Sequence, residues 1–153
     1  EVRNRYAPEA AISILSNGSM LHKSSVKEAL KRVDKNILKL DTGIESTFHT
    51  INQASGGLTL DKVINNLVAF DGKLIIQTLF VRGEYNGKVI DNTTDKEIEA
   101  WLKVLDKINP EYIMIYPIER GTAAKDIEKI PEEELIAIAE KVEALGISTK
   151  VYF

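Results

Sequence analysis

Four apolar segments of the chain each end in polar side chains, and this repeated pattern limits the fold more than any other feature. The segments are residues 12–18, 37–42, 73–83 and 112–121. Asp41 ends the second segment, Asn17 ends the first, and Gln77 lies inside the third. In α/β proteins, buried parallel strands present polar side chains where the strands end. The pattern therefore predicts a parallel sheet with a site along one edge.

Helical patterns lie between these segments. Residues 25–28 and 94–97 both read Ser/Thr-x-x-Glu, the capping box that begins a helix, and Thr59 is a predicted helix cap. Trp101 lies in register with apolar neighbours and is predicted to be core. Pro131 is expected at the first position of a helix, with Glu132–Glu134 in its first turn, where acidic side chains are favoured. We expect residues 84–92 to be a polar loop and residues 147–153 to be a fifth strand.

The order of predicted elements is strand then helix, four times, followed by a closing strand. Strand centres lie roughly 25 to 40 residues apart, the spacing of right-handed βαβ units. Five strands in 153 residues form either an open doubly wound sheet or part of a barrel, and periodicity cannot separate the two. We expect one α/β domain, residues 1–153, with parallel strands and four main helices.

Composition excludes several classes of protein. The net charge is −3, and no basic block interleaves with aromatic residues, so a nucleic-acid surface is not predicted. No apolar run approaches about 18 residues, so we expect no membrane span. The chain has no cysteine, which excludes disulfides and thiolate metal sites within it. His22 and His49 are too few for a histidine-based metal site and are expected on loops or the surface.

Five motifs in order resemble the later part of the radical S-adenosylmethionine (radical SAM) enzymes. They are residues 15–21, 39–41, 47–52, 77–83 and 116–120. The resemblance is nearest to iron–sulfur oxidoreductases of the wyosine-synthesis type and looser to pyruvate-formate-lyase-activating enzymes. It covers nearly the whole chain, and the spacing between motifs is also similar.

The resemblance implies a partial (β/α) TIM-like barrel in a cytoplasmic enzyme. A three-cysteine loop would hold a 4Fe–4S cluster, and an external electron donor would drive reductive cleavage of S-adenosylmethionine to a radical. The substrate would be a protein glycyl residue or a tRNA base, and the acidic balance of the chain argues against tRNA. The chain would begin just before the third strand of such a barrel. Without cysteines, we expect it to be inactive by itself.

Three residues match positions that contact the cofactor in that family. Asp41 would accept hydrogen bonds from the ribose, although a strand-end aspartate can also cap the following turn. Asn17 would also contact the cofactor, although Asn-Gly is a common turn that supplies positive φ. Gln77 lies inside an apolar strand, where an amide needs a hydrogen-bond partner, and relatives often carry glutamate there.

Lys39, Glu119 and Arg120 are the predicted substrate-binding residues. Lys39 points to the same side of its strand as Asp41, which indicates a face that holds ligand. Glu119 and Arg120 match an acidic–arginine pair at a strand end, although such a pair can be a simple surface ion pair. Arg82, at the end of the third segment, has the same ambiguity and is a weaker candidate.

Two other functions and one surface property stay open at this point. Lys39 could form a Schiff base in a metal-free TIM-like lyase or aldolase. The chain could also be a binding module that kept the fold and lost the cluster. Without preceding strands, the strand at residues 12–16 becomes an unprotected sheet edge. We therefore expect the chain to self-associate or to cover this edge with its own N-terminal segment.

Overall fold

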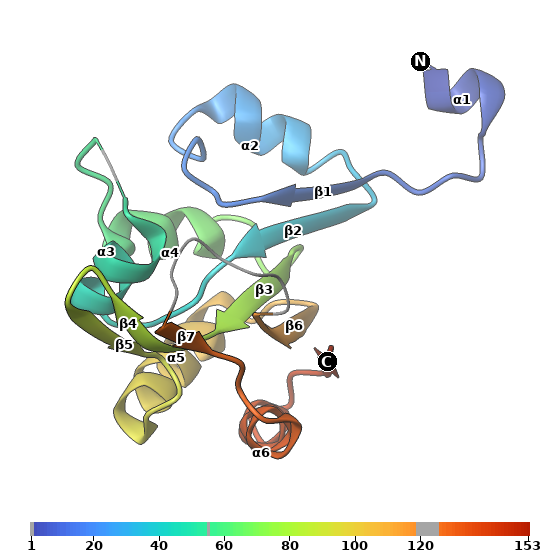
Figure 1. Ribbon diagram of the computed structural model, residues 1–153. Helices are drawn as coiled ribbons and strands as arrows, with labels where there is room; N and C mark the ends of the chain where they lie inside the picture. Colours follow the sequence, from blue (N-terminus) through green and yellow to red (C-terminus); the bar gives the residue numbers. More distant parts are fainter. Residues whose placement is uncertain (1, 55, 119–125) are drawn as a thin grey trace.

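The computed structural model describes residues 2–54, 56–118 and 126–153, and a five-stranded parallel sheet forms its centre. The strands are β1 (Ser13–Ser16), β2 (Lys35–Lys39), β3 (Ile75–Phe80), β6 (Tyr112–Pro117) and β8 (Thr149–Val151). They lie side by side in chain order, and each is parallel to its neighbours (Figure 1). A doubly wound sheet reverses its strand order at a switch point. The consecutive order is instead that of a barrel wound in one direction, and the predicted parallel α/β fold is confirmed.

Helices cover one face of this sheet. They are α2 (Ser24–Leu30), α3 (Glu45–Asn52), α4 (Leu60–Val68), α5 (Asp95–Ile108) and α6 (Glu132–Glu143). Alternate strand residues such as Leu38, Ile76 and Ile113 are fully buried in one apolar cluster with residues of the helices. The residues between them point the other way and are only half buried, as Gln77 and Met114 are. This second face corresponds to the inside of a barrel.

Trp101 of α5 joins the helices to the sheet, as predicted for a core residue. It is 1% exposed, and its ring meets that of Phe80 edge-on at a centroid distance of 5.3 Å. The indole Nε1–H donates a hydrogen bond of 3.2 Å to the carbonyl oxygen of Leu40. A buried indole N–H needs such a partner, so this contact helps to set the position of α5 beneath the end of β2.

Two of the predicted helix caps are confirmed and one is wrong. Thr59 and Thr94 each accept a hydrogen bond of 3.3 Å from the backbone N–H three residues later. The predicted cap at Ser25 is wrong, because α2 begins at Ser24 with Lys23 as its N-cap and no side-chain cap bond. Ser25 already lies inside the first turn, where its hydroxyl cannot take the N-cap position. The predicted place of Pro131 at the first position of its helix is also wrong, because α6 begins at Glu132 and Pro131 is its N-cap.

The prediction of a polar loop at residues 84–92 is also wrong. Strands β4 (Arg82–Tyr85) and β5 (Lys88–Asp91) form a hairpin, and β7 (Asp126–Glu128) completes a three-stranded antiparallel sheet. Asn86 and Gly87 connect the strands with φ values of 50° and 72°, as a two-residue hairpin turn requires. The hairpin strands are largely polar and half exposed, so they lack the apolar pattern from which strands are usually predicted.

The N-terminal segment forms a short helix, α1 (Val2–Tyr6), that the sequence pattern did not predict. Figure 1 shows α1 beyond the end of β1, away from the other helices. Within the described ranges, β1 pairs only with β2, so its outer edge has no paired strand. Strand β8 is shorter than the fifth strand predicted at residues 147–153. No helix in the described part of the chain has the length and apolar character needed to cross a membrane.

Candidate functional site

Asp41 lies directly after β2, at the carboxyl end of the parallel sheet, and its side chain is fully buried. Its Oδ1 accepts a hydrogen bond of 3.0 Å from the backbone N–H of Leu79. Its Oδ2 accepts one of 3.0 Å from Nδ2 of Asn52 and lies 3.0 Å from the Lys39 ammonium. The carboxylate therefore joins β2, β3 and α3.

Burial raises the pKa of the Asp41 carboxyl above its ordinary value, because the charged form loses its hydration. The positive charge of Lys39 and hydrogen bonds from Leu79, Lys39 and Asn52 act in the opposite direction but do not cancel the effect of burial. Tyr116 on β6 belongs to the same group of residues. Burial, together with the negative charge of Asp41, raises the pKa of its hydroxyl to about 12.

Register places Lys39 and Gln77 beside Asp41. Lys39 of β2 pairs with Gln77 of β3, which pairs with Met114 of β6, so these three side chains share the face that is not packed against the core. The amide of Gln77 makes no hydrogen bond to the described part of the chain. The structure thus brings together three of the predicted site residues.

The remaining predicted site residues do not all lie near Asp41, and two of them are outside the described part of the chain. Asn17 is exposed on the turn after β1, where its Oδ1 accepts a hydrogen bond of 3.1 Å from the Ser19 N–H. The sequence analysis considered this role of Asn17 in a turn, and contact between Asn17 and a cofactor stays a prediction. Glu119 and Arg120 lie outside the described residues. Arg82 is bound to two carboxylates, with nitrogen–oxygen distances of 3.1 Å to Asp91 and 2.7 Å to Glu134, and so joins the hairpin to α6.

Asn92 is a site residue that the sequence analysis missed. It is 1% exposed, and its Nδ2 donates hydrogen bonds of 2.8 Å to the carbonyl oxygens of both Asp41 and Leu79. Its Oδ1 accepts one of 2.8 Å from the Val81 N–H. This amide therefore holds the ends of β2 and β3 in place around the carboxylate. Its position in a segment expected to be a loop concealed that role.

A second buried carboxylate fixes the loop that follows Asp41. Glu97 of α5 is 7% exposed and accepts hydrogen bonds from the hydroxyls of Thr42, at 2.6 Å, and Thr47. The capping-box pattern had assigned this glutamate to its own helix terminus. Gly43 lies against the backbone of α5, because a Cβ added there would be 2.4 Å from the carbonyl carbon of Ala100. The loop carrying Asp41 is thus packed tightly on α5.

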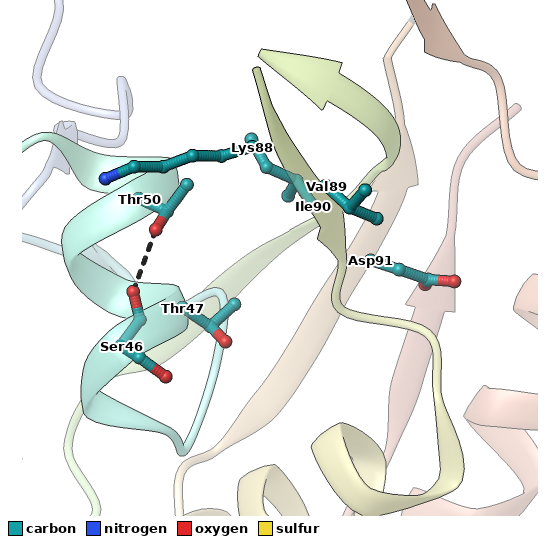
Figure 2. A pocket seen from close by; sticks show the side chains of 7 residues that line it. All are labelled: Ser46, Thr47, Thr50, Lys88, Val89, Ile90 and Asp91. Atoms are coloured by element: carbon teal, nitrogen blue, oxygen red, sulfur yellow. Dashed lines mark hydrogen bonds between the residues drawn. The ribbon is translucent and has the colours of Figure 1, made fainter. Parts of the chain in front are cut away.

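A polar cavity of about 500 Å³ lies beside this loop, between α3 and β5. Figure 2 shows Ser46, Thr47 and Thr50 of α3 facing β5, with the Lys88 side chain extending across the opening toward α3. The Thr50 hydroxyl donates a hydrogen bond of 3.0 Å to the Ser46 carbonyl oxygen. Asp41 does not line this cavity, so any ligand held here would lie beside the carboxylate and not on it.

A metal cluster has no ligand set in this part of the protein. The sequence contains no cysteine, and the described residues include no group of three or more histidine, aspartate and glutamate side chains that could hold a metal ion. A 4Fe–4S cluster therefore does not fit the residues of this chain.

No protein-family model matches the chain, and its curated relatives are distant. It is 28% identical to a GTPase Obg of Brachyspira hyodysenteriae over 81% of this chain and 18% of that protein. It is 27% identical to a UPF0026 protein of Helicobacter pylori (88% of this chain, 42% of that protein). The identity to a UPF0026 protein of Methanocaldococcus jannaschii is 26% (82% and 38%). The chain thus spans well under half the length of each relative.

Solved structures are similar over nearly the whole chain. A radical SAM methyltransferase from Sphaerobacter thermophilus superposes with a TM-score of 0.69 and 14% identity, over 92% of this chain and 40% of that one. A domain of a pyruvate-formate lyase-activating enzyme from Bacteroides vulgatus gives 0.67 and 15%, over 93% and 82%. At these sequence identities the structural comparison supports a conclusion about the fold alone. The chain therefore has the TIM-like barrel fold of radical SAM proteins, as the resemblance of its sequence predicted.

Proposed function

We propose that this chain forms the cofactor- and substrate-binding wall of a radical SAM enzyme. The observation that carries the proposal is the buried Asp41 carboxylate, paired with Lys39 at the carboxyl end of the sheet on the face not packed against the core. In barrels of this kind, ligands bind at the carboxyl ends of the strands. A carboxylate, an ammonium and a free amide there can bind a ligand that carries hydroxyl, amino and carboxyl groups.

The donors already present at Asp41 limit how a ligand can reach it. Oδ2 has two donors, Asn52 and Lys39, whereas Oδ1 has one and keeps a lone pair. Since the Asp41 side chain is fully buried and that of Lys39 is 29% exposed, Lys39 is the group that must move. S-adenosylmethionine offers hydroxyl donors to Asp41 and a carboxylate to the displaced ammonium, and Gln77 can bind either. Asn17 would contact the same cofactor from the end of β1.

We assign the reductive cleavage of S-adenosylmethionine to a longer protein that contains this chain, and not to the residues of the chain itself. The chain spans 38 to 42% of the UPF0026 relatives, so the cluster, its electron donor and the radical reaction belong to the proposal for the whole protein. When bound, the cluster and cofactor would supply the radical. Lys39, Glu119 and Arg120 would contact the substrate. A protein glycyl residue suits the net charge of −3 better than a tRNA base does.

Two other activities have less support. A Schiff-base lysine must lose its proton to attack a carbonyl, whereas the Asp41 carboxylate, 3.0 Å from Lys39, stabilises the protonated ammonium. GTP hydrolysis is not carried over from the named GTPase, because the sequence has no Gly-x₄-Gly-Lys-Ser/Thr phosphate loop. A binding module without catalysis stays as the second candidate, because no cysteine accompanies the fold.

The experiment uses the longer natural protein that contains this sequence. We expect it, after anaerobic reconstitution with iron and sulfide, to form 5′-deoxyadenosine from S-adenosylmethionine and a reductant. Asp41→Asn should lower that rate about tenfold or more, because it removes the charge that the ligand meets. Asp61→Asn, an exposed carboxylate in the first turn of α4, is the matched control and should have no effect.

Two results would contradict the enzyme proposal. One is a longer protein that binds no cluster and forms no 5′-deoxyadenosine. The other is a natural protein that starts close to Glu1, which would leave the binding module as the better account.

A further inference from the structure

Asn36 is a buried amide without any hydrogen bond. It is the second residue of β2 and is 6% exposed, and neither its Oδ1 nor its Nδ2 has a partner among the described residues. Its side chain points to the helix-covered face, where Leu38 follows it. A buried donor and a buried acceptor left unpaired together are costly, and native proteins seldom contain such a pair.

This amide lines a cavity of about 450 Å³ at the amino ends of β2, β3 and β6. Leu30 and Phe70, which are 5% and 3% exposed, form apolar walls beside it. Asp71, Lys73 and Glu111 also line the cavity, and their side chains make no hydrogen bond or ion pair with the described residues. Lys31 and Asp34 line it as well, so five of the ten lining residues are charged. A cavity of this volume, with polar groups converging beside apolar side chains, has the size of a small-molecule site.

The shape of the amide restricts the ligand. Oδ1 and Nδ2 present an acceptor and a donor side by side on one edge of a flat group. The complementary edge has a donor beside an acceptor, which primary carboxamides and nucleobases offer, as in the pairing of asparagine with adenine. A trans peptide bond directs its N–H and C=O to opposite sides and can satisfy only one of the two. Leu30 and Phe70 offer apolar contact to a flat ring.

We propose that this cavity binds a small, flat molecule through a carboxamide or nucleobase edge that pairs with Asn36. Neither amide atom is exposed to solvent, so a ligand reaches them only when a side chain of the cavity lining moves aside. The site lies at the opposite end of β2 from Asp41, about 16 Å away along the strand. It is separate from the proposed catalytic end and independent of that proposal.

The test compares the wild-type chain with Asn36→Leu, which keeps the size of the side chain and removes its polar atoms. Nicotinamide is the carboxamide probe and adenine the nucleobase probe, each titrated to millimolar concentration. We expect one probe to shift the side-chain NH₂ resonances of Asn36 and to raise the Tm by about 2 °C or more. Asn36→Leu should raise the Tm of the free chain and weaken that probe at least about tenfold. Asn65→Leu, an exposed asparagine of α4, is the control and should change neither.

The outcomes separate the possible ligands and can overturn the proposal. A response to nicotinamide alone assigns a carboxamide, and a response to adenine alone assigns a nucleobase. Unshifted Asn36 resonances with both probes would overturn the proposal, as would equal binding to Asn36→Leu. If that variant does not fold, the wild-type resonances decide alone. A lower Tm for a folded Asn36→Leu chain would mean that water satisfies the amide, and that also counts against a ligand site.

Discussion

At the scale of single residues, Asp41 shows two opposing electrostatic effects. Removing the carboxylate from water disfavours its charge, while the Lys39 ammonium and two hydrogen-bond donors favour it. Burial is the larger effect and raises the pKa of this carboxyl. In the folded protein the group therefore holds its proton to a higher pH than it does in the unfolded chain, and this difference links the site to stability.

We predict that the stability of the wild-type chain falls relative to Asp41→Asn as the pH rises above about 4. In this range the unfolded chain loses the Asp41 proton while the folded chain keeps it, so rising pH favours unfolding. The slope is at most about 1.4 kcal/mol per pH unit, and the loss ends at the raised pKa. Urea unfolding of the wild-type chain and of Asp41→Asn between pH 4 and 8 measures this difference in stability. A stability difference that stays flat, or that moves in favour of the wild type, would disprove the raised pKa.

The sequence predicted part of this site because strand alternation is local. Lys39 and Asp41 are two residues apart, and an alternating strand places both on one side. Asn52, Asn92 and Glu97 were not identified as partners of this region. Their bonds to the loop after β2 and to α3 span 11, 51 and 50 to 55 residues of sequence, so only the folded arrangement brings them together.

At the scale of elements, the position of the site depends on how closely α5 approaches the β2–α3 loop. Glu97 accepts one hydroxyl hydrogen bond from Thr42 of that loop and one from Thr47 of α3, and Trp101 donates to the last carbonyl before Asp41. Gly43 permits this approach because it has no side chain. Its φ is not in the left-handed region, so the requirement is one of space alone.

Gly43→Ala is therefore expected to lower the free energy of unfolding by about 3 kcal/mol, because its methyl group would overlap the backbone of Ala100. Gly56→Ala is the comparison. That glycine has φ +68° and no atom within 4 Å of an added Cβ, so only strain of about 1 kcal/mol applies. Chemical unfolding of both variants gives the two values. Equal losses would mean that α5 can shift away from the loop at little cost.

Helices and strands were predicted correctly where the apolar pattern was clear, and they were missed where polar and apolar residues were mixed. The predicted cap at Thr59, the capping box at residues 94–97 and the apolar register of Trp101 identified α4 and α5. The β4–β5 hairpin was missed because half of its strand residues are charged and its strands lack a clear apolar alternation. Its Asn86-Gly87 turn was the signal that could have identified it.

At the scale of the whole molecule, the sheet has one covered face, and β1 and β8 are its two outer strands in the described part of the chain. Leu15 of β1 is 61% exposed and points away from the core cluster, beside an outer strand edge that pairs with no described strand. The helix α1 does not add a strand to that edge. Exposed apolar side chains beside an unpaired edge favour association with another strand.

We propose that the 153-residue chain self-associates through β1, and we predict that Leu15→Lys weakens the association at least about tenfold. A lysine on an edge strand opposes strand pairing because its charge would lose hydration in the interface. Val89→Lys is the control, since Val89 is 82% exposed on β5 of the other sheet. Sedimentation velocity over a range of concentrations measures the association of the wild-type chain and of the two variants. A wild-type chain that stays monomeric at high concentration would rule the association out.

The consecutive strand order has a consequence for how such a molecule can change in evolution. In the five-stranded sheet, each strand is hydrogen-bonded only to the sheet strand before it and the sheet strand after it in the chain. Further strand–helix units can therefore be added at either end of the sheet without moving the strands between. The residues at one strand end can likewise change while Asp41 and its neighbours keep their places.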